Sequence, residues 1–334
     1  TTPTESTTSV TTPTESTTTE TTLSKSTSTP SVTITSSSLS PGTSESSVAA
    51  IELFSYGTLA GDIEGELGDD VEVATLDNPI GFTCDCEIST KAYVYSNGYV
   101  TLDTQFSSNL PVKFPSSYTS HVKMIAPFWA DVMTDPTDSK IWYHFYNKYN
   151  PDAQSETFLS KAEQLLRDYF PNENQVQNFN ANTAVKVTWE NIYPRPLVQA
   201  ENATVQLIII SDGITTYTGF LYGNIYWSPD VPRELVSSWQ CSHNGGYYNH
   251  PASLETNFPS EIVTSSNTRV PKNGLWLFKT DTCSDTFVNY GQLCYEWVQN
   301  VASKETSTLS RLNVFLPDCP CNFYQASNDP FFLQ

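Results

Sequence analysis

The first 48 residues restrict the fold of this chain most, because they contain 32 Ser or Thr residues, four Pro and no aromatic residue. A segment with so little apolar surface cannot offset the entropy that a backbone loses on ordering. We therefore expect no folded core in residues 1–48. All Trp, Tyr, Phe and Cys residues lie in residues 49–334. This length suffices for one large domain or two small ones.

The same 48 residues contain a repeat, since Thr1–Thr8 recurs unchanged as Thr11–Thr18. Hydroxyl groups at this density, interrupted by Pro, are typical of mucin-like O-glycosylation. Pro residues and attached sugars both favour extended conformations. These features predict an extended stalk that carries sugars. An unmodified disordered linker is the alternative interpretation.

The net charge of −20 follows the same division, with −3 on residues 1–48 and the rest on the later part. Nucleic acids are unsuitable partners for so acidic a chain, because their phosphates are bound mainly by Lys and Arg. The acidity favours diffuse attraction of cations, including calcium or a mineral surface. A run of about 18 apolar residues, which a membrane span requires, does not occur in the sequence.

Seven cysteines occur at spacings that do not match the paired C-x-x-C motifs of zinc sites. Behind a tail of secreted type, they are better interpreted as disulfide candidates. An odd number leaves one thiol free, paired with another chain, or paired with a residue outside this sequence. Because the sequence begins within a repeat and ends without a natural boundary, we expect a fragment of a longer protein. The candidates are Cys84, Cys86, Cys241, Cys283, Cys294, Cys319 and Cys321.

Residues 49–281 show the pattern of a mostly antiparallel β domain, with aromatic and β-branched runs separated by turn residues. Asn97-Gly98 predicts a type I′ hairpin, and Asp212-Gly213 separates a second pair of runs. Such short connections suit antiparallel strands. The expected strands lie within Ala92–Leu102, Lys123–Val132, Lys140–Tyr146, Ala184–Trp189, Thr204–Ile210, Thr215–Tyr222 and Leu275–Phe278.

One segment, between Pro151 and Pro171, has helical spacing instead. We expect its helix to begin at Ser155 and to end before Pro171. The predicted fold class is therefore mainly β with one packed helix, preceded by a disordered mucin-like tail and followed by a small disulfide-containing segment. The apolar residues that recur at helical spacing are Phe158, Ala162, Leu165 and Tyr169.

Several of these motifs resemble the nidogen-like (NIDO) domain of extracellular matrix and adhesion proteins. Ser96–Leu102 (SNGYVTL) and then Met124–Val132 (MIAPFWADV) carry the resemblance. Phe54–Asp70 is similar to the opening of that domain, and Thr204–Trp227 is similar to its hairpin pair. Because the motifs occur in the expected order, we expect a nidogen-like domain over residues 49–281.

A second resemblance follows. Cys294–Trp297 (CYEW) and Leu316–Ala326 (LPDCPCNFYQA) are similar to the start of the adhesion-associated AMOP domain, so residues 282–334 are expected to be a partial AMOP-like domain. Tail and both domains together resemble the mucin-4-like group of cell-surface and matrix mucins. This resemblance implies a secreted or matrix protein, or the ectodomain of a membrane-anchored mucin. It also implies partners among other matrix or cell-surface proteins.

Two features are candidates for modification or metal binding. Asn202 begins the sequon Asn202-Ala203-Thr204 and lies before an expected strand, so we predict N-glycosylation there. The acidic run 62–72 does not have the spacing of an EF-hand loop. We interpret its carboxylates as a solvated face that attracts cations diffusely, and we predict no dedicated metal site. The acidic residues are Asp62, Glu64, Glu66, Asp69, Asp70 and Glu72.

The residues that could support catalysis do not form a known motif. The sequence has no H-E-x-x-H motif, no nucleophile elbow and no phosphate-binding loop. Asp131 and Asp135 could mimic paired carboxylates, but such pairs are common at strand ends. Cys84-Asp85-Cys86 is better interpreted as two structural half-cystines than as a redox site. We therefore predict no enzyme, no catalytic residue and no cofactor. The histidines considered are His121, His144, His243 and His250.

The aromatic residues have two interpretations. We assign most Trp residues to the core, because they fall in expected strands. Tyr247 and Tyr248 lie beside Gly245-Gly246, where a loop tip could contact a partner, although a core or surface role is the more frequent one. The Trp residues assigned to the core are Trp129, Trp142, Trp189, Trp227 and Trp276.

Three functions remain open at this point. The resemblances favour a non-enzymatic adhesion or matrix glycoprotein with a stalk and protein-interaction domains. The acidity suggests, as an alternative, an organic-matrix protein associated with a calcium biomineral, although long Asp or Glu runs are missing. An extracellular hydrolase is the third and least favoured, because no catalytic constellation occurs.

Overall fold

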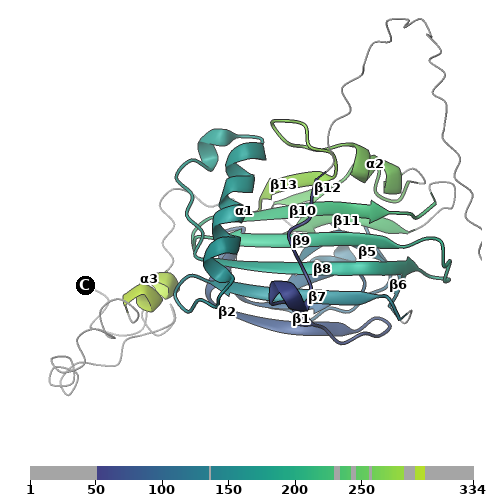
Figure 1. Cartoon of the computed structure of the whole chain (residues 1–334), viewed down its shortest axis with the longest axis horizontal. Helices are drawn as coiled ribbons and strands as arrows, with labels where there is room; N and C mark the ends of the chain where they lie inside the picture. Colours follow the sequence, from purple (N-terminus) through teal and green to yellow (C-terminus); the bar gives the residue numbers. More distant parts are fainter. Residues whose placement is uncertain are drawn as a thin grey trace, which may run out of the picture. The chain divides into compact units, whose positions relative to one another are not determined.

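The computed structural model describes residues 51–134, 137–228, 234–241, 246–255, 258–281 and 290–297. Within these residues the chain forms two antiparallel sheets that pack face to face (Figure 1). Every strand pair in the described part of the chain is antiparallel. The expected mainly β fold class with a packed helix is therefore confirmed.

The first sheet has seven strands in the order β1-β7-β8-β9-β10-β13, with β6 paired beside β8. Neighbouring strands β8, β9 and β10 follow one another in sequence, so short loops connect the centre of this sheet. Its strands are β1 (Ile63–Glu64), β6 (Val132–Met133), β7 (Lys140–Asn147), β8 (Thr183–Pro194), β9 (Ala203–Ser211), β10 (Thr216–Ile225) and β13 (Leu275–Lys279).

The second sheet has six strands in the order β12-β11-β5-β4-β3-β2. The strands β2, β3, β4 and β5 form a continuous meander, and the later strand β11 adds to β5. Its strands are β2 (Glu72–Cys84), β3 (Glu87–Tyr95), β4 (Tyr99–Leu102), β5 (Lys123–Ala130), β11 (Leu235–Gln240) and β12 (Tyr247–Asn249).

The main core lies between the two sheets. Phe82 and Phe128 from the six-stranded sheet pack there with Trp189 and Phe220 from the seven-stranded sheet, and each of these side chains is 0% exposed. Both sheets are also covered on their outer faces, so β5 and β9 are buried along almost their whole length. This double burial explains why their sequences are continuously apolar rather than alternating. All five Trp residues assigned to the core are buried.

Helix α1 (Ser155–Tyr169) covers the outer face of the seven-stranded sheet (Figure 1). Phe158 stacks on Tyr146 of β7 with ring centroids 3.8 Å apart. The helix begins at Ser155, as predicted. Asp152 accepts hydrogen bonds from the backbone N–H groups of Gln154 and Ser155, which satisfies donors that a helix start leaves without partners.

The N-terminal segment 51–62 crosses the same outer face. Phe54 exchanges two hydrogen bonds with the side chain of Gln206 in β9, and its ring lies 5.0 Å from that of Phe158. A 3-10 helix, η1 (Thr58–Ala60), then leads to β1 at the sheet edge. The segment that resembles the opening of a nidogen-like domain is thus packed against the sandwich.

The tight turns differ in part from the prediction. Tyr95 pairs with Tyr99, so the β3–β4 connection has three residues, and of Asn97 and Gly98 only Gly98 has a positive φ, +79°. The predicted type I′ turn at Asn97-Gly98 is therefore wrong, because that turn needs two residues with positive φ. The expected hairpin at Asp212-Gly213 is confirmed, with Ser211 paired to Thr216.

Two short α-helices and two further 3-10 helices were not expected from the sequence. No described helix is both long and apolar enough to cross a membrane. The expected stalk, residues 1–48, lies outside the described residues, as does the AMOP-like segment 282–334 except for α3. The additional elements are α2 (Phe258–Thr264), α3 (Tyr290–Trp297), η2 (Ser117–Thr119) and η3 (Glu173–Gln175).

Candidate interaction site

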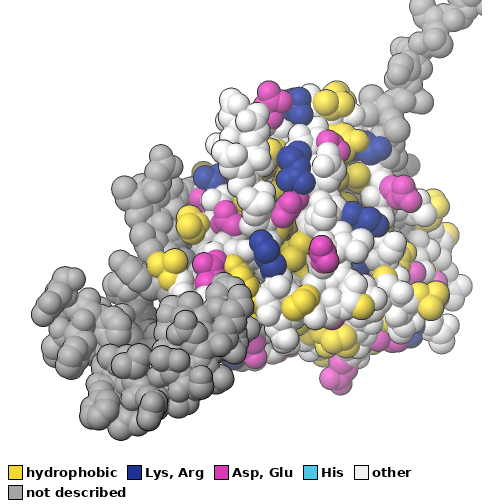
Figure 2. Space-filling model, turned by 60° about the vertical axis from the view of Figure 1, so that its left-hand side comes forward, with side chains coloured by type: hydrophobic (Ala, Val, Ile, Leu, Met, Phe, Trp, Pro, Cys, Tyr) yellow, Lys and Arg dark blue, Asp and Glu magenta, His cyan; other side chains and the backbone are white. Residues whose placement is uncertain are grey.

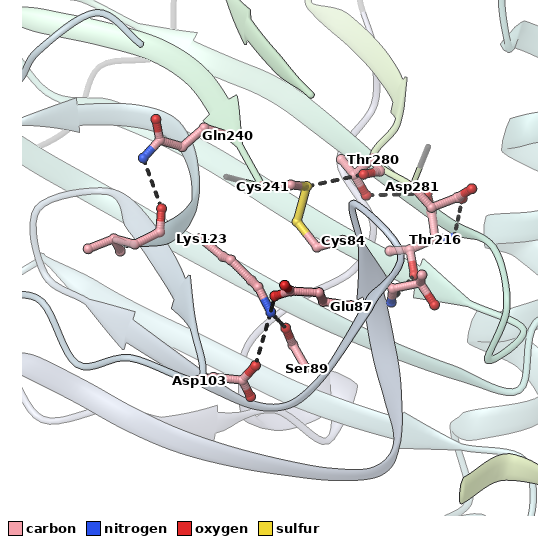
Figure 3. The surroundings of a disulfide bond; sticks show 12 residues. Cys84, Glu87, Ser89, Asp103, Lys123, Thr216, Gln240, Cys241, Thr280 and Asp281 are labelled. Atoms are coloured by element: carbon pink, nitrogen blue, oxygen red, sulfur yellow. Dashed lines mark hydrogen bonds and ion pairs between the residues drawn. A yellow bond between two sulfur atoms is a disulfide. The ribbon is translucent and has the colours of Figure 1, made fainter. Parts of the chain in front are cut away.

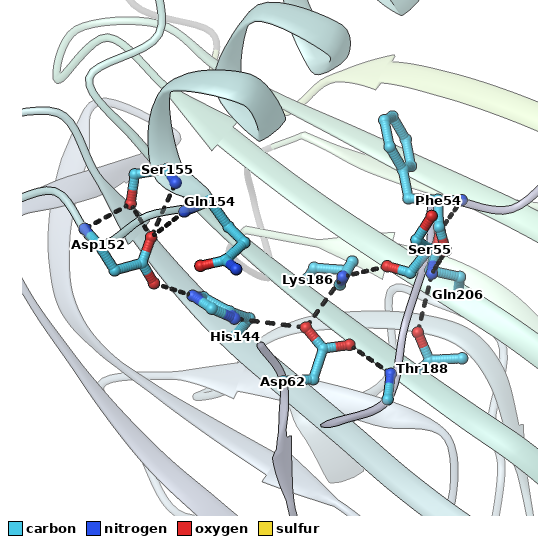
Figure 4. Close-up of polar contacts among 11 residues, drawn as sticks. Phe54, Ser55, Asp62, His144, Asp152, Gln154, Ser155, Lys186, Thr188 and Gln206 are labelled. Atoms are coloured by element: carbon cyan, nitrogen blue, oxygen red, sulfur yellow. Dashed lines mark hydrogen bonds and ion pairs between the residues drawn. The ribbon is translucent and has the colours of Figure 1, made fainter. Parts of the chain in front are cut away.

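A network of buried charges holds the N-terminal segment on the sheet (Figure 4). The carboxylate of Asp62 is fully buried and lies 3.0 Å from Nζ of Lys186, whose side chain is 1% exposed. Lys186 also donates a hydrogen bond to the carbonyl of Ser55 at 2.6 Å. Asp62 in turn accepts a hydrogen bond from the N–H of Gly57. These contacts join the segment to the middle of β8.

His144 of β7 extends this network toward α1. Its Nδ1 lies 3.4 Å from Asp62, and its Nε2 lies 2.5 Å from Asp152. Burial alone would lower the pKa of His144, but the hydrogen bonds to both carboxylates outweigh burial and raise it. Burial lowers the pKa of Lys186, against the opposing effect of Asp62. The charged groups of the network thus bind one another beneath the segment.

The acidic run 62–72 is not a solvated face throughout. That interpretation is wrong for Asp62, which is buried. Glu64 forms an ion pair with Lys140, and Glu72 accepts a hydrogen bond from Gln105. Sequence spacing gave no sign of these partners, because they lie on distant strands and loops.

Two other residues of that run, Asp69 and Asp70, join Asp131 in a cluster whose carboxylate oxygens lie within 4.8 Å of one another. Arg195 binds two of these carboxylates. Its Nη2 lies 2.5 Å from Asp69, and its Nε lies 3.2 Å from Asp131. Asp70 accepts a hydrogen bond from Asn97. A guanidinium therefore supplies positive charge where a cation would otherwise be needed, so the cluster alone does not indicate a metal site.

Beside Arg195 and Asp131 is a surface cavity of about 670 Å³. It lies where strand ends of the two sheets meet. Ala130 ends β5, Pro194 ends β8, Trp227 follows β10 and Glu234 precedes β11. Trp227 is 3% exposed and packs edge-on against Phe128, so one wall of the cavity is anchored in the main core. The volume of this cavity and its position at strand ends are typical of a binding site.

Arg195 was not among the residues considered from the sequence, and Asp131 was considered only as a partner of Asp135. Asp135 lies outside the described residues. The structure instead pairs Asp131 with Arg195, 64 positions later in the chain. The backbone supports this pair, since the N–H of Arg195 donates to the carbonyl of Asp131. Such a long-range pairing has no local sequence signal.

A disulfide joins Cys84 at the end of β2 to Cys241 directly after β11, across 157 positions (Figure 3). Both residues are 1% exposed. Cys86 lies at the tip of the β2–β3 hairpin, is exposed, and has no disulfide partner among the described residues. The other four disulfide candidates have no described side chain, so their pairing stays a prediction.

The remaining candidates lie apart from the cavity. Asn202 is half-buried immediately before β9, which leaves its N-glycosylation a prediction. His121 is exposed, whereas His250 is buried, and burial lowers its pKa to about 4. Tyr247 is 50% exposed, and Tyr248 packs on Phe278 with ring centroids 4.6 Å apart. His243 lies outside the described residues.

Charges of both signs are mixed on the face of the molecule shown in Figure 2, where Lys and Arg side chains alternate with Asp and Glu. A large negative net charge therefore does not appear as one acidic patch on that face.

Comparison with known proteins identifies the family. Residues 90–282 match the nidogen-like domain. The chain is 26% identical to Mucin-4 of Mus musculus over 302 residues, which is 84% of this chain and 8% of that protein. It is 31% identical to Alpha-tectorin of Mus musculus over 57% of this chain and 9% of that protein.

A third relative is Nidogen-1 of Mus musculus, 30% identical over 51% of this chain and 13% of that protein. The chain thus spans only a small part of the length of each of these relatives. No solved structure matches it. Because the family match covers more than half of the chain, this protein belongs to the nidogen-like domain family.

Proposed function

We propose that this chain is part of a non-enzymatic extracellular adhesion or matrix glycoprotein, in which an O-glycosylated stalk carries a nidogen-like domain that contacts other matrix or cell-surface proteins. The main support for this proposal is the combination of a Ser/Thr-rich segment, residues 1–48, with the nidogen-like domain. The similarity to Mucin-4 over 84% of the chain extends beyond the residues that the family match covers.

The contacts of the charged groups support a non-enzymatic function. His144 lies between Asp62 and Asp152 and is covered by the N-terminal segment. Lys186 is equally enclosed and bonded. Both side chains are almost fully buried, His144 at 8% and Lys186 at 1% exposure, which favours a structural role for them.

The buried disulfide supports an extracellular location, because such bonds persist in oxidising compartments. We propose a secreted or matrix protein, or the ectodomain of a membrane-anchored mucin, with N-glycosylation at Asn202. The domain boundaries 1–48, 49–281 and 282–334, with a partial AMOP-like domain in the last part, belong to this proposal. Strands β1 and β2, which precede residue 90, pair with both sheets and support an early start of the nidogen-like domain.

We do not propose the mineral-associated alternative, because it depends on net charge and no specific contact favours it. Five of the six carboxylates in the run 62–72 have a polar partner within the protein, which reduces their availability for a mineral surface.

Retention on extracellular matrix tests the proposed function. The full chain, secreted from cultured animal cells, would be added to matrix that cells have deposited and from which they have been removed. We expect retention of the full chain, and much weaker retention of a glycosylated peptide of residues 1–48. Equal retention of the two, or none of the full chain, would show that the domain does not mediate adhesion.

The same secreted material tests the compartment. Its intact mass should fall to that of the 37.1 kDa polypeptide when O- and N-linked glycans are removed. A mass that is unmodified from the start, with most thiols reduced, would contradict an extracellular glycoprotein.

A further inference from the structure

The cavity beside Arg195 has an apolar wall and an exposed apolar rim. Trp227 and Pro194 line it, and so do Leu110 and Val198, which are 58% and 37% exposed. Tyr226, the neighbour of Trp227, is 58% exposed. Large apolar side chains that remain exposed around a concave surface are typical of a protein-binding site.

The charges of the cavity are mainly negative among the described residues. Asp131, Glu201 and Glu234 line it, and Asp69 and Asp70 lie beside Asp131. Near these five carboxylates lies one guanidinium, that of Arg195, which binds Asp69 and Asp131. Partial burial raises the pKa of Asp131, and the nearby Asp70 and Asp69 add to this effect against the opposing influence of Arg195. The lining of the cavity has three carboxylates and one guanidinium, so a further cationic group is favoured there.

We propose that this cavity binds an extended segment of a partner protein that presents a Lys or Arg side chain next to an aliphatic one. The aliphatic side chain packs against Leu110, Val198 and Trp227, and the cationic one pairs with Asp131 and Glu234. This assignment rests on the proposed adhesive function and specifies the surface and the class of partner.

The charges argue against two other occupants. A second copy of this chain would bring a net charge of −20 to an acidic surface, so association between copies is opposed by repulsion. A polyanionic sugar or nucleic acid would be repelled for the same reason. A basic segment is favoured by the same field, and its binding should weaken as salt screens the charges.

The first test uses the full chain and three labelled synthetic peptides in fluorescence anisotropy. One peptide repeats Lys-Val-Gly, the second repeats Glu-Val-Gly and the third repeats Lys-Ser-Gly. We expect the first to bind about tenfold more tightly than either of the others, because it alone supplies both features. Equal binding of the first two peptides, or no binding of the first, overturns the proposal.

Two variants place the binding at this cavity. Glu234→Lys should weaken binding of the Lys-Val-Gly peptide about fivefold, and Leu110→Ser about tenfold. The matched controls are Glu52→Lys and Leu59→Ser, which change exposed residues that do not line the cavity. Thermal unfolding of all four variants establishes that they remain folded. Equal effects of the cavity variants and their controls would contradict the proposed location.

Sedimentation and matrix retention separate the remaining outcomes. If the chain dimerises and Leu110→Ser abolishes the dimer, a second copy occupies the cavity and the proposal is wrong. If matrix retains the wild type and both cavity variants equally, the cavity assignment is wrong while the adhesive function stands. If the peptide binds at the cavity but matrix retains nothing, the adhesive function is wrong while the specificity of the cavity stands.

Discussion

Lys186 lies in the middle of β8 with 1% of its side chain exposed, and Asp62 compensates its charge. Removing one member of a buried pair leaves the other charge without compensation, which costs about 3 kcal/mol or more. Lys186→Met should therefore lower the free energy of unfolding by about 3 kcal/mol, as measured by urea denaturation.

Lys140→Met is the matched control for this variant, because its ion pair with Glu64 is partly exposed. We expect a loss of about 1 kcal/mol or less from the control. Equal losses from the two lysine variants would mean that the Lys186–Asp62 pair does not contribute as a buried pair. A double variant, Lys186→Met with Asp62→Asn, should recover part of the loss.

His144 makes the same network sensitive to pH. Asp62 and Asp152 raise the pKa of His144 in the folded protein, although burial opposes them. The unfolded chain has a His pKa of about 6.5. Because the pKa of His144 is higher in the folded protein, its protonation stabilises the fold fully at pH values below the unfolded-state pKa. This stabilisation is lost as the pH rises through the folded-state pKa.

Urea denaturation of wild type and His144→Gln at several pH values measures this effect. The difference in unfolding free energy between the two proteins should be largest at about pH 6 and should decrease toward about pH 9. A difference that grows with rising pH would contradict a protonated His144 in the folded state. His121→Gln provides the control, because His121 is exposed.

At the scale of elements, the β3–β4 hairpin depends on Gly98. Its φ is +79°, and a Cβ atom would lie 2.1 Å from the carbonyl oxygen of Phe128 in β5. Gly98→Ala should lower the free energy of unfolding by about 3 kcal/mol, because it combines an unfavourable φ with a backbone clash.

Gly61→Ala isolates the first of these two causes, since Gly61 also has a positive φ, +81°, and the atoms nearest to its Cβ, 3.1 Å away, belong to the movable end of the Gln154 side chain. It should cost only about 1 kcal/mol in the same denaturation experiment. If both glycine variants lose the same stability, the close approach of the hairpin to β5 does not matter.

Sequence patterns predicted most of the strands but not the type of every turn. Alternating and apolar runs located β5, β7, β8, β9, β10 and β13, because burial between two layers selects these residues directly. The predicted turn type at Asn97 was wrong, because the side chain of Asn97 bonds to Asp70 and to the backbone of Ser108 and Val132. Those partners are distant in sequence, and a local turn rule takes no account of them.

The candidate site was less predictable for the same reason. The acidic run and Asp131 were noted separately, but Arg195, which connects them, follows β8. The cavity forms from the ends of strands of both sheets, so none of its residues is close in sequence to all of the others. Periodicity predicts which face of a strand is buried, whereas the meeting of strand ends depends on the whole topology.

At the scale of the whole molecule, the Cys84–Cys241 disulfide closes a loop of 157 positions that contains strands of both sheets, from β3 to β11. Closing a loop of this length restricts the unfolded chain, so replacing both cysteines with Ala should cost about 4 kcal/mol. Cys86→Ala is the control and should change the free energy of unfolding by about 0.5 kcal/mol or less. A large loss from Cys86→Ala would show that its thiol has a structural partner.

Truncated chains test the boundary between the stalk and the domain. Residues 1–48 have too few apolar side chains for a core, whereas in segment 51–62 Phe54 bonds to Gln206 and Asp62 pairs with Lys186. A chain that starts at residue 49 should unfold with the same free energy as the full chain in urea. A chain that starts at residue 63 should lose about 5 kcal/mol or fail to fold, because it leaves Lys186 buried without its carboxylate and uncovers the sheet. Equal stability of the two truncated chains would place the domain boundary after the segment, closer to residue 90, where the family match begins.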